Sequence, residues 1–252
     1  MDLGLKDKKA MVTGGTRGIG RAIAMRFAME GADLAICARN REEVAETVAA
    51  LQGMGVKATG AAVDVSNGAA LKAWINDAAG ELGGLDILVP NVSAMAGNTE
   101  EDWRRAFEID VMGTINTIDG ALPFLEKSDA GAVVCINSVA ALQYFGGVRS
   151  YGTMKAALVN HLSNLAHAYA PQGLRFNSVS PGTIYFKGGV WHQREQQMPE
   201  AYKAALGANP MGRMGSPEEV ANATVFLASP MASFITGTNL LVDGAMTPSV
   251  QY

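Results

Sequence analysis

The chain has 252 residues, of which 48% are hydrophobic and 17% are charged. This much apolar surface is enough to build a core, so an intrinsically disordered protein is excluded. Twenty basic and twenty-four acidic side chains give a net charge of −4, and neither sign dominates any long stretch. We therefore expect neither nucleic-acid nor membrane-surface binding. The length fits one large α/β domain over residues 1–252.

Three local features indicate a reducing compartment and a soluble chain. Residues 1–9 lack the apolar segment of a secretory signal, so we expect a cytoplasmic protein. The two cysteines, Cys37 and Cys135, lie in apolar runs without a nearby His or Cys, which predicts buried core thiols and no metal site. The longest uncharged run, residues 220–242, is interrupted by a proline, a glycine and polar residues, which predicts a helix followed by a strand.

Apolar runs of strand length alternate with longer segments of helical period along most of the chain. This alternation is typical of βαβ units and predicts a single doubly wound α/β domain, with a parallel sheet of about seven strands flanked by helices. The apolar runs are nearly continuous, which fits strands that helices cover on both faces. The expected strands are residues 10–13, 33–38, 57–63, 85–89, 132–137, 175–179 and 239–242.

Helix boundaries can be predicted from caps and breakers. A capping-box motif at residues 216–219 predicts a helix that runs to about residue 228. A second cap at residues 99–102 opens a helix that we expect to end at Leu122, because Pro123 follows. Residues 183–210 lack the rhythm of the sheet and are rich in Gln, Gly and aromatic residues, which predicts an excursion from the sheet edge.

A glycine-rich segment joins the first expected strand to the first expected helix. Gly14, Gly18 and Gly20 have the spacing G-x-x-x-G-x-G, which differs from the commoner G-x-G-x-x-G. Such a turn lets the backbone approach a pyrophosphate at the helix N-terminus, whose free N–H groups and dipole favour anions. Glycine also serves turns for steric reasons alone, so it is the position after the first strand that favours a nucleotide site.

The end of the second expected strand indicates which dinucleotide binds. Residues 37–40 contain Arg39 and no carboxylate that could accept from the ribose 2′-hydroxyl of NAD. Arg17, in the glycine-rich turn, can approach the same position, and two guanidinium groups suit the 2′-phosphate of NADP. We therefore expect NADP(H) to be favoured over NAD(H), the alternative being that Arg39 is a solvated loop residue.

Tyr151 and Lys155 lie four residues apart, on one face of an expected helix. That pattern is common, but Ser138 stands directly after the strand expected at residues 132–137. In a parallel sheet this strand end and this helix start lie at the carboxyl edge, as does the glycine-rich turn. The sequence therefore predicts a hydroxyl, a phenol and an ammonium group beside the nucleotide site.

With these residues the chain resembles the short-chain dehydrogenase/reductase family over nearly its whole length, and it looks most like bacterial carbonyl reductases of the 3-oxoacyl-reductase type. The motifs that carry the resemblance are Thr13-Gly14-x-x-x-Gly18-x-Gly20, Asp64-Val65, Asn91, Ser138, Tyr151-x-x-x-Lys155, Pro181-Gly182 and Val242-Asp243-Gly244. The resemblance implies a Rossmann-type fold and a homotetramer or homodimer. The cofactor-binding residues that it implies are Gly14, Thr16, Arg17, Gly18, Ile19, Gly20, Arg39, Asp64, Val65, Asn91, Tyr151, Lys155, Pro181, Gly182 and Ile184.

The resemblance also implies an NADP(H)-dependent oxidoreductase that interconverts a ketone or aldehyde and an alcohol. Tyr151 would exchange a proton with the substrate oxygen during hydride transfer, and Ser138 would hydrogen-bond that oxygen. Lys155 would hold the nicotinamide ribose and favour the phenolate form of the tyrosine. Two alternatives stay open: a catalytically silent NADP(H)-binding protein, and lyase or epimerase chemistry on the same scaffold.

Three positions depart from the family pattern. Pro90-Asn91-Val92-Ser93 replaces the usual Asn-Asn-Ala-Gly, which changes one wall of the adenosine channel. Asp110 replaces a helix asparagine that completes a proton relay through the lysine, and we expect Asp110 to take that relay position as a fourth catalytic residue. The bland alternative is an aspartate turned to solvent. Phe186 stands where a threonine often contacts the nicotinamide amide, so the amide would rely on backbone groups near Ile184.

The excursion at residues 183–210 lies where the family keeps its substrate lid. Gly188 and Gly189 would supply a hinge. The large apolar side chains in this lid suit an apolar or aromatic substrate. The alternative is that these side chains only pack against the protein. The lid residues expected to meet the substrate are Tyr185, Phe186, Trp191 and His192.

Overall fold

The computed structural model describes residues 2–144 and 149–248, and within them seven parallel strands form a sheet in the order β3-β2-β1-β4-β5-β6-β7. The strands are β1 (Lys9–Thr13), β2 (Asp33–Ala38), β3 (Ala58–Ala62), β4 (Ile87–Val89), β5 (Ala132–Ile136), β6 (Arg175–Pro181) and β7 (Asn239–Val242). The strand order reverses direction between β1 and β4, which is the topological switch point of a doubly wound fold. The expected Rossmann-type fold is confirmed.

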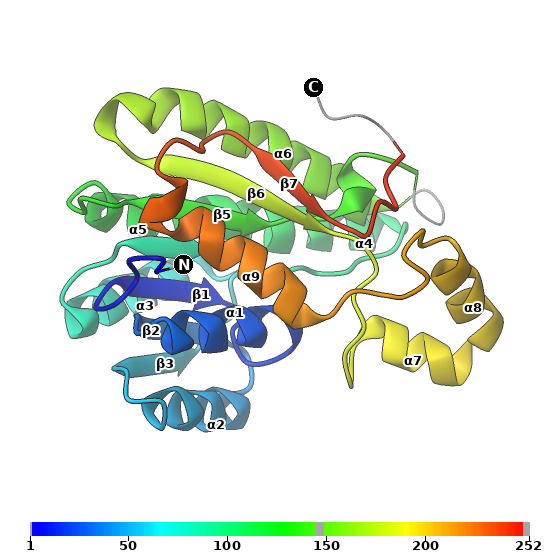
Figure 1. Cartoon of the computed structure of the whole chain (residues 1–252), viewed down its shortest axis with the longest axis horizontal. Coiled ribbons are helices and arrows are strands. Elements are labelled where there is room, and N and C mark those ends of the chain that lie inside the picture. Colours follow the sequence, from blue (N-terminus) through cyan, green and yellow to red (C-terminus); the bar gives the residue numbers. More distant parts are fainter. Residues whose placement is uncertain (1, 145–148, 249–252) are drawn as a thin grey trace.

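Helices cover both faces of the sheet (Figure 1). One face carries α1 (Gly18–Met29), α2 (Arg41–Gln52) and α9 (Pro217–Ala228), and the other carries α3 (Gly68–Leu82), α5 (Gly113–Leu125) and α6 (Ser150–Tyr169). Successive residues of β1 enter the two cores in turn, with Met11 in one and Val12 in the other. The strands read as continuous apolar runs because both of their faces are buried. Cys37 and Cys135 are buried free thiols, as predicted.

The segment expected as one helix from Thr99 to Leu122 is divided. The capping box between Thr99 and Asp102 opens α4 (Glu100–Ala106), and α5 follows after a π-helical turn. The prediction that Pro123 ends the helix is wrong, because α5 continues to Leu125. Pro123 has no N–H to donate to the carbonyl four residues earlier, but Asp119 is exposed, so its carbonyl can bond to water instead.

The π-helical turn between α4 and α5, η1 (Phe107–Met112), was not expected. A π turn contains more residues than an α turn, so it changes which residues of the following helix face the sheet, and such turns are frequent at functional sites. Asp110 lies in this turn and is 0% exposed. The turn therefore points a carboxylate into the protein interior.

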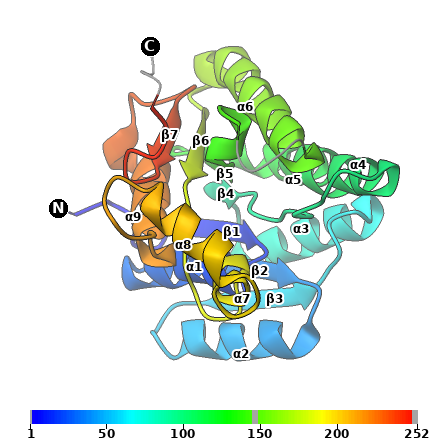
Figure 2. The same cartoon turned by 90° about the vertical axis from the view of Figure 1, so that its right-hand side faces the viewer.

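Residues 183–210 contain two short helices, α7 (Val190–Gln197) and α8 (Pro199–Gly207). They stand out from the body on the side toward which the strand arrows point, at the right of Figure 1, and lie in front of the sheet in Figure 2. We call residues 183–210 the lid segment. At its base, the Gly215 N–H donates to the Thr183 carbonyl and the Tyr185 N–H donates to the Gly215 carbonyl, each at 2.9 Å.

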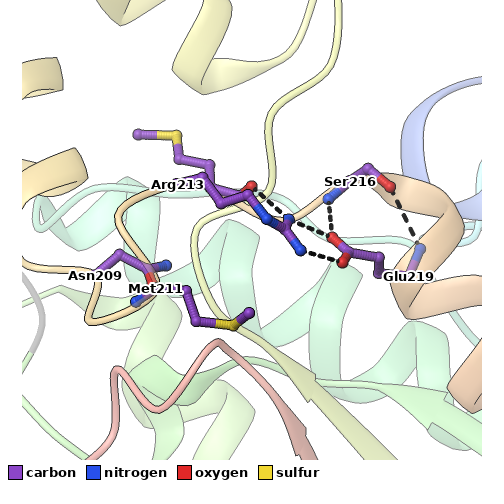
Figure 3. Close-up of polar contacts among 6 residues, drawn as sticks. Asn209, Met211, Arg213, Ser216 and Glu219 are labelled. Carbon is purple, nitrogen blue, oxygen red and sulfur yellow. Dashed lines mark hydrogen bonds and ion pairs between the residues drawn. The ribbon is translucent and has the colours of Figure 1, made fainter.

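The chain returns from the lid segment through polar contacts with the start of α9 (Figure 3). The guanidinium group of Arg213 binds both carboxylate oxygens of Glu219, at 2.9 and 2.6 Å. Glu219 also accepts from the Ser216 N–H at 2.9 Å, and the Ser216 hydroxyl accepts from the Glu219 N–H. These bonds, that of Arg213 first, lower the pKa of Glu219 to about 2. One carboxylate thus serves the expected capping box and anchors the end of the lid segment.

Among the helices of residues 2–144 and 149–248, none combines the length and the apolar character that a membrane crossing requires.

Candidate active site

A cavity of about 830 Å³ lies at the carboxyl edge of the sheet. It is lined by the loops that follow the strands β1 to β6, by the start of α6 and by α7. Open α/β sheets bind ligands at this edge. Of the residues expected to bind a cofactor, the cavity is lined by Gly14, Thr16, Arg17, Ile19, Gly20, Arg39, Asp64, Val65, Asn91, Tyr151, Lys155, Pro181, Gly182 and Ile184.

The glycine-rich turn is closed around the start of α1. Gly14 and Gly18 have φ values of +67° and +54°, which residues with a side chain rarely adopt. A Cβ on Gly20 would come within 2.1 Å of the Gly14 carbonyl oxygen. The side-chain amide of Asn91 donates to the carbonyls of Thr13 and Gly14, at 3.1 and 3.2 Å. In the first turn of α1, Ile19 and Gly20 line the cavity, and a helix N-terminus of this kind fits a pyrophosphate.

Phe186 covers Gly18, the one expected cofactor residue that is absent from the described cavity lining. A Cβ on Gly18 would come within 2.5 Å of the Phe186 ring, and a Cβ on Gly189 within 2.8 Å. The ring is thus sandwiched between the glycine-rich turn and the start of α7. Gly188, expected as a hinge, has a φ of +83°. The aromatic residue at the family's threonine position therefore links the lid segment to the nucleotide end of the cavity.

The end of the cavity beside β2 holds charges of both signs. Arg17 and Arg39 are exposed and line it. Glu43, in the first turn of α2, also lines it and accepts a hydrogen bond from the Thr16 hydroxyl at 2.9 Å. Sequence reasoning missed Glu43, although the Asn40 cap could have placed it in the first helical turn, since the Asn40 side chain accepts from the Glu43 N–H at 3.2 Å.

Asp64, in the loop after β3, is engaged within its own turn. Its carboxylate accepts from the N–H and the hydroxyl of Ser66, at 3.0 and 2.7 Å. These bonds, together with the nearby charges of Arg39 and Arg105, hold the pKa of Asp64 below its ordinary value. Asp64 is therefore ionised at neutral pH and shapes the loop on which Val65 lines the cavity.

Ser138, Tyr151 and Lys155 all line this cavity, so the expected constellation is brought together. Ser138 is the second residue after β5 and caps a short 3₁₀ turn by accepting from the Ala140 N–H at 3.1 Å. That contact uses the oxygen as acceptor and leaves the hydroxyl hydrogen for another partner. Tyr151 and Lys155 lie in the first two turns of α6.

The ammonium group of Lys155 is held behind Tyr151. Its Nζ donates to the Ile136 carbonyl at 3.1 Å and lies 3.4 Å from Oδ1 of Asp110. It also lies 6.0 Å from the centre of the Tyr151 ring. Burial lowers the pKa of Lys155, but the negative charge of Asp110, followed by that of Tyr151, outweighs it and leaves this pKa above its ordinary value. Lys155 is therefore a cation at neutral pH.

Asp110 does not turn to solvent. Its Oδ2 accepts from the Ala94 N–H at 2.9 Å, and its Oδ1 has no hydrogen bond in the described chain, only the ion pair with Lys155. The carboxylate lies behind Lys155, outside the cavity lining. It joins the lysine to the loop after β4, which is a wall of the cavity.

The lid segment contributes to the cavity through Phe186 and Trp191, two of the four residues expected to meet a substrate. The other two, Tyr185 and His192, pack edge-on within the lid segment with ring centres 6.1 Å apart. The Tyr185 hydroxyl donates to Glu195, and this bond raises the pKa of Tyr185 to about 12. Tyr185 and His192 are absent from the lining and hold the lid segment together instead.

Two arginines that sequence reasoning missed also line the cavity. Arg149 is the N-cap residue of α6, two positions before Tyr151. Arg194 lies on α7, with its guanidinium carbon 4.7 Å from the centre of the Trp191 ring. The spacing of Trp191 and Arg194 on one helix face was the available signal for that contact. The signal for Arg149 was its position two residues before Tyr151.

Comparisons with known proteins show what the chain is similar to. A family model described as Enoyl-(Acyl carrier protein) reductase matches residues 14–247. The chain is 38% identical over 257 residues to isoepoxydon dehydrogenase patN of Penicillium expansum, covering 99% of this chain and 98% of the relative. L-sorbose reductase of Gluconobacter frateurii, solved with NADPH and L-sorbose, has a TM-score of 0.93 and 31% identity, over 99% of this chain and 100% of that chain. A 7 alpha-hydroxysteroid dehydrogenase solved with NADH and 7-oxo glycochenodeoxycholic acid has a TM-score of 0.90 and 31% identity, over 96% of this chain and 95% of that chain.

Proposed function

The chain belongs to the short-chain dehydrogenase/reductase family, and from this premise we propose that it is an oxidoreductase that interconverts a ketone or aldehyde and an alcohol. One observation carries the proposal: Ser138, Tyr151 and Lys155 line the same cavity as the glycine-rich turn. A substrate oxygen can therefore meet a phenol and a hydroxyl beside a bound dinucleotide. The large apolar faces of Phe186 and Trp191 in that cavity suit an apolar or aromatic substrate.

We propose NADP(H) in preference to NAD(H) as the cofactor, which when bound would supply or accept the hydride. The first turn of α1 would hold its pyrophosphate. Arg17 and Arg39 would hold a 2′-phosphate through bidentate hydrogen bonds. Of the two solved relatives described above, one holds NADPH and the other NADH, so the preference rests on these two arginines.

The chain's own residues would transfer the proton and stabilise the charge that develops on the substrate oxygen. Tyr151 gives a proton to the substrate oxygen during reduction and takes it back during oxidation. The Ser138 hydroxyl donates to the same oxygen and stabilises the negative charge that develops on it. The ammonium group of Lys155 favours the phenolate form of Tyr151. Asp110 takes the relay position of the family by acting through Lys155, so its effect on the reaction is one of positioning and charge.

The proposal is tested by a panel of apolar and aromatic ketones and alcohols, followed through cofactor absorbance with NADPH and NADH side by side. Wild type should turn over part of the panel, and Tyr151→Phe should lose about 10²- to 10⁴-fold in kcat. A wild type that binds NADPH but is inert toward the whole panel would favour a silent binding protein. Product formation without net cofactor oxidation would favour lyase or epimerase chemistry.

We also propose that the chain acts as a homotetramer or homodimer in the cytoplasm, on the family resemblance. Sedimentation velocity of the purified chain would measure the size of the assembly, and a monomer at the concentrations used for activity would contradict this part of the proposal.

A further inference from the structure

Two cations that line the cavity, Arg149 and Arg194, have no anion to balance them within the described residues. Arg149 is N-terminal to Tyr151 on α6, and Arg194 faces the same cavity from α7 in the lid segment. Within residues 2–144 and 149–248, neither guanidinium group forms an ion pair or a hydrogen bond, while Arg194 rests on the Trp191 ring. After burial, the charge of Arg149 is the second cause of a lowered pKa at Arg194, so the two groups are close enough to repel each other.

The acidic side chains of the described lining lie elsewhere. They are Glu43, bonded to Thr16, and Asp64, bonded to Ser66, and both belong to the end of the cavity where β2 and β3 finish. The carboxylate next to Arg194, that of Glu195, is occupied by the Tyr185 hydroxyl. The positive charge beside Tyr151 is therefore available to a ligand.

We infer that the substrate carries a carboxylate, which Arg149 and Arg194 bind while its carbonyl meets Tyr151 and Ser138. A guanidinium group matches the two oxygens of a carboxylate with parallel N–H donors. An anion that binds between two guanidinium groups also relieves the repulsion between them. This inference rests on the proposed oxidoreductase function and names its substrate class: an oxo acid or hydroxy acid with an apolar or aromatic body.

The positions of Arg149 and Arg194 indicate that they bind the substrate and not the cofactor. The phosphate-binding candidates, Arg17 and Arg39, stand at the glycine-rich turn and the end of β2. Arg149 is instead the N-cap residue of α6, two positions before Tyr151, whose phenol acts on the substrate. The Trp191 ring lies under Arg194 and offers an apolar face next to the cation, so a substrate's body and its carboxylate can be bound side by side.

The test compares benzoylpropionate and benzoylbutyrate with their methyl esters, which differ in charge at the same chain length. Wild type should prefer the acids in kcat/KM by roughly tenfold to 100-fold, the ratio expected for charge-assisted hydrogen bonds. Arg149→Gln and Arg194→Gln should each reduce the acid-to-ester ratio about tenfold. Arg104→Gln, which removes the same charge from an exposed ion pair on α4, is the matched control and should keep the wild-type ratio.

A binding measurement that needs no turnover accompanies it. Phenylbutyrate, which has no reducible carbonyl, is titrated calorimetrically into protein saturated with NADP⁺, and its Kd should rise about tenfold in each arginine variant. If wild type reduces the esters as well as the acids, or if the variants weaken NADP⁺ binding without moving the ratio, the carboxylate site is refuted and the oxidoreductase stands. If no carbonyl or alcohol is turned over but phenylbutyrate binding depends on both arginines, the anion site stands and the proposed reaction fails.

Discussion

The Nζ of Lys155 lies 3.4 Å from Oδ1 of Asp110, and the two side chains are 3% and 0% exposed. A buried cation and a buried carboxylate at this distance support each other, because each would be costly alone. The pair lies directly behind the phenol that we propose as the proton donor. The charge of Lys155 therefore depends on Asp110, which lies outside the cavity lining.

The first prediction concerns Asp110→Asn, which keeps the shape of the side chain and removes its charge. Without the carboxylate, the largest effect that opposes burial of the ammonium is lost, so the pKa of Lys155 falls from its raised position. Loss of a negative charge near the phenol also favours the phenolate. Both effects should move the pH profile of kcat/KM to lower pH. An unchanged profile and rate in the variant would refute the relay role.

The second prediction concerns cofactor choice. Arg39→Ala and Arg17→Ala should each raise the KM for NADPH by about 10- to 100-fold, because a charge-assisted hydrogen bond contributes roughly 1.5–3 kcal/mol. The KM for NADH should change little. Arg41→Ala is the control, since Arg41 is an exposed neighbour outside the cavity lining. Equal losses with both cofactors would mean that the arginines do not read the 2′-phosphate.

The third prediction concerns the glycine-rich turn. Gly20→Ala should weaken NADPH binding at least about tenfold, or roughly 1.4 kcal/mol, because the added Cβ would lie 2.1 Å from the Gly14 carbonyl oxygen and force the turn open. Gly80→Ala is the matched control, since a Cβ there would meet nothing within 4 Å. Fluorescence titration with NADPH measures both variants. Wild-type affinity in Gly20→Ala would contradict the tight packing of the turn.

The fourth prediction concerns the anchor of the lid segment. The pKa of Glu219 is lowered from 4.5 to about 2, so its ionised form stabilises the fold above pH 4.5, and that contribution is lost as pH falls through about 2. Glu219→Gln should cost about 1 kcal/mol at neutral pH, since the pair with Arg213 is half-exposed and screened. Below pH 3 the difference from wild type should shrink.

Thermal unfolding between pH 2 and 7 checks this prediction. Glu218→Gln removes a neighbouring charge that is exposed at the same helix start, and it should leave the pH dependence of wild type intact. A Glu219→Gln variant with the wild-type pH dependence would show that the carboxylate does not contribute through its charge.

The sequence by itself determined the fold class and indicated the residues that we propose for the reaction. The βαβ alternation, the glycine spacing from Gly14 to Gly20, and the order of Ser138, Tyr151 and Lys155 are local patterns. A parallel sheet then brings every strand end to one edge, so residues far apart in the chain meet without knowledge of their packing. The capping boxes at Thr99 and Ser216 could be predicted for the same reason, because a cap depends on residues within one turn.

Only the tertiary structure decided which other side chains reach the cavity. The π-helical turn that buries Asp110 follows from packing between α4, α5 and α6, and no periodicity in the sequence indicated it. Glu43, Arg149 and Arg194 reach the cavity from three separate helices, because the directions of their side chains depend on how those helices dock. The fold, the residues that we propose for the reaction, and Arg17 and Arg39 could therefore be predicted from local patterns, whereas the side chains that reach the cavity from other helices depend on how those helices pack.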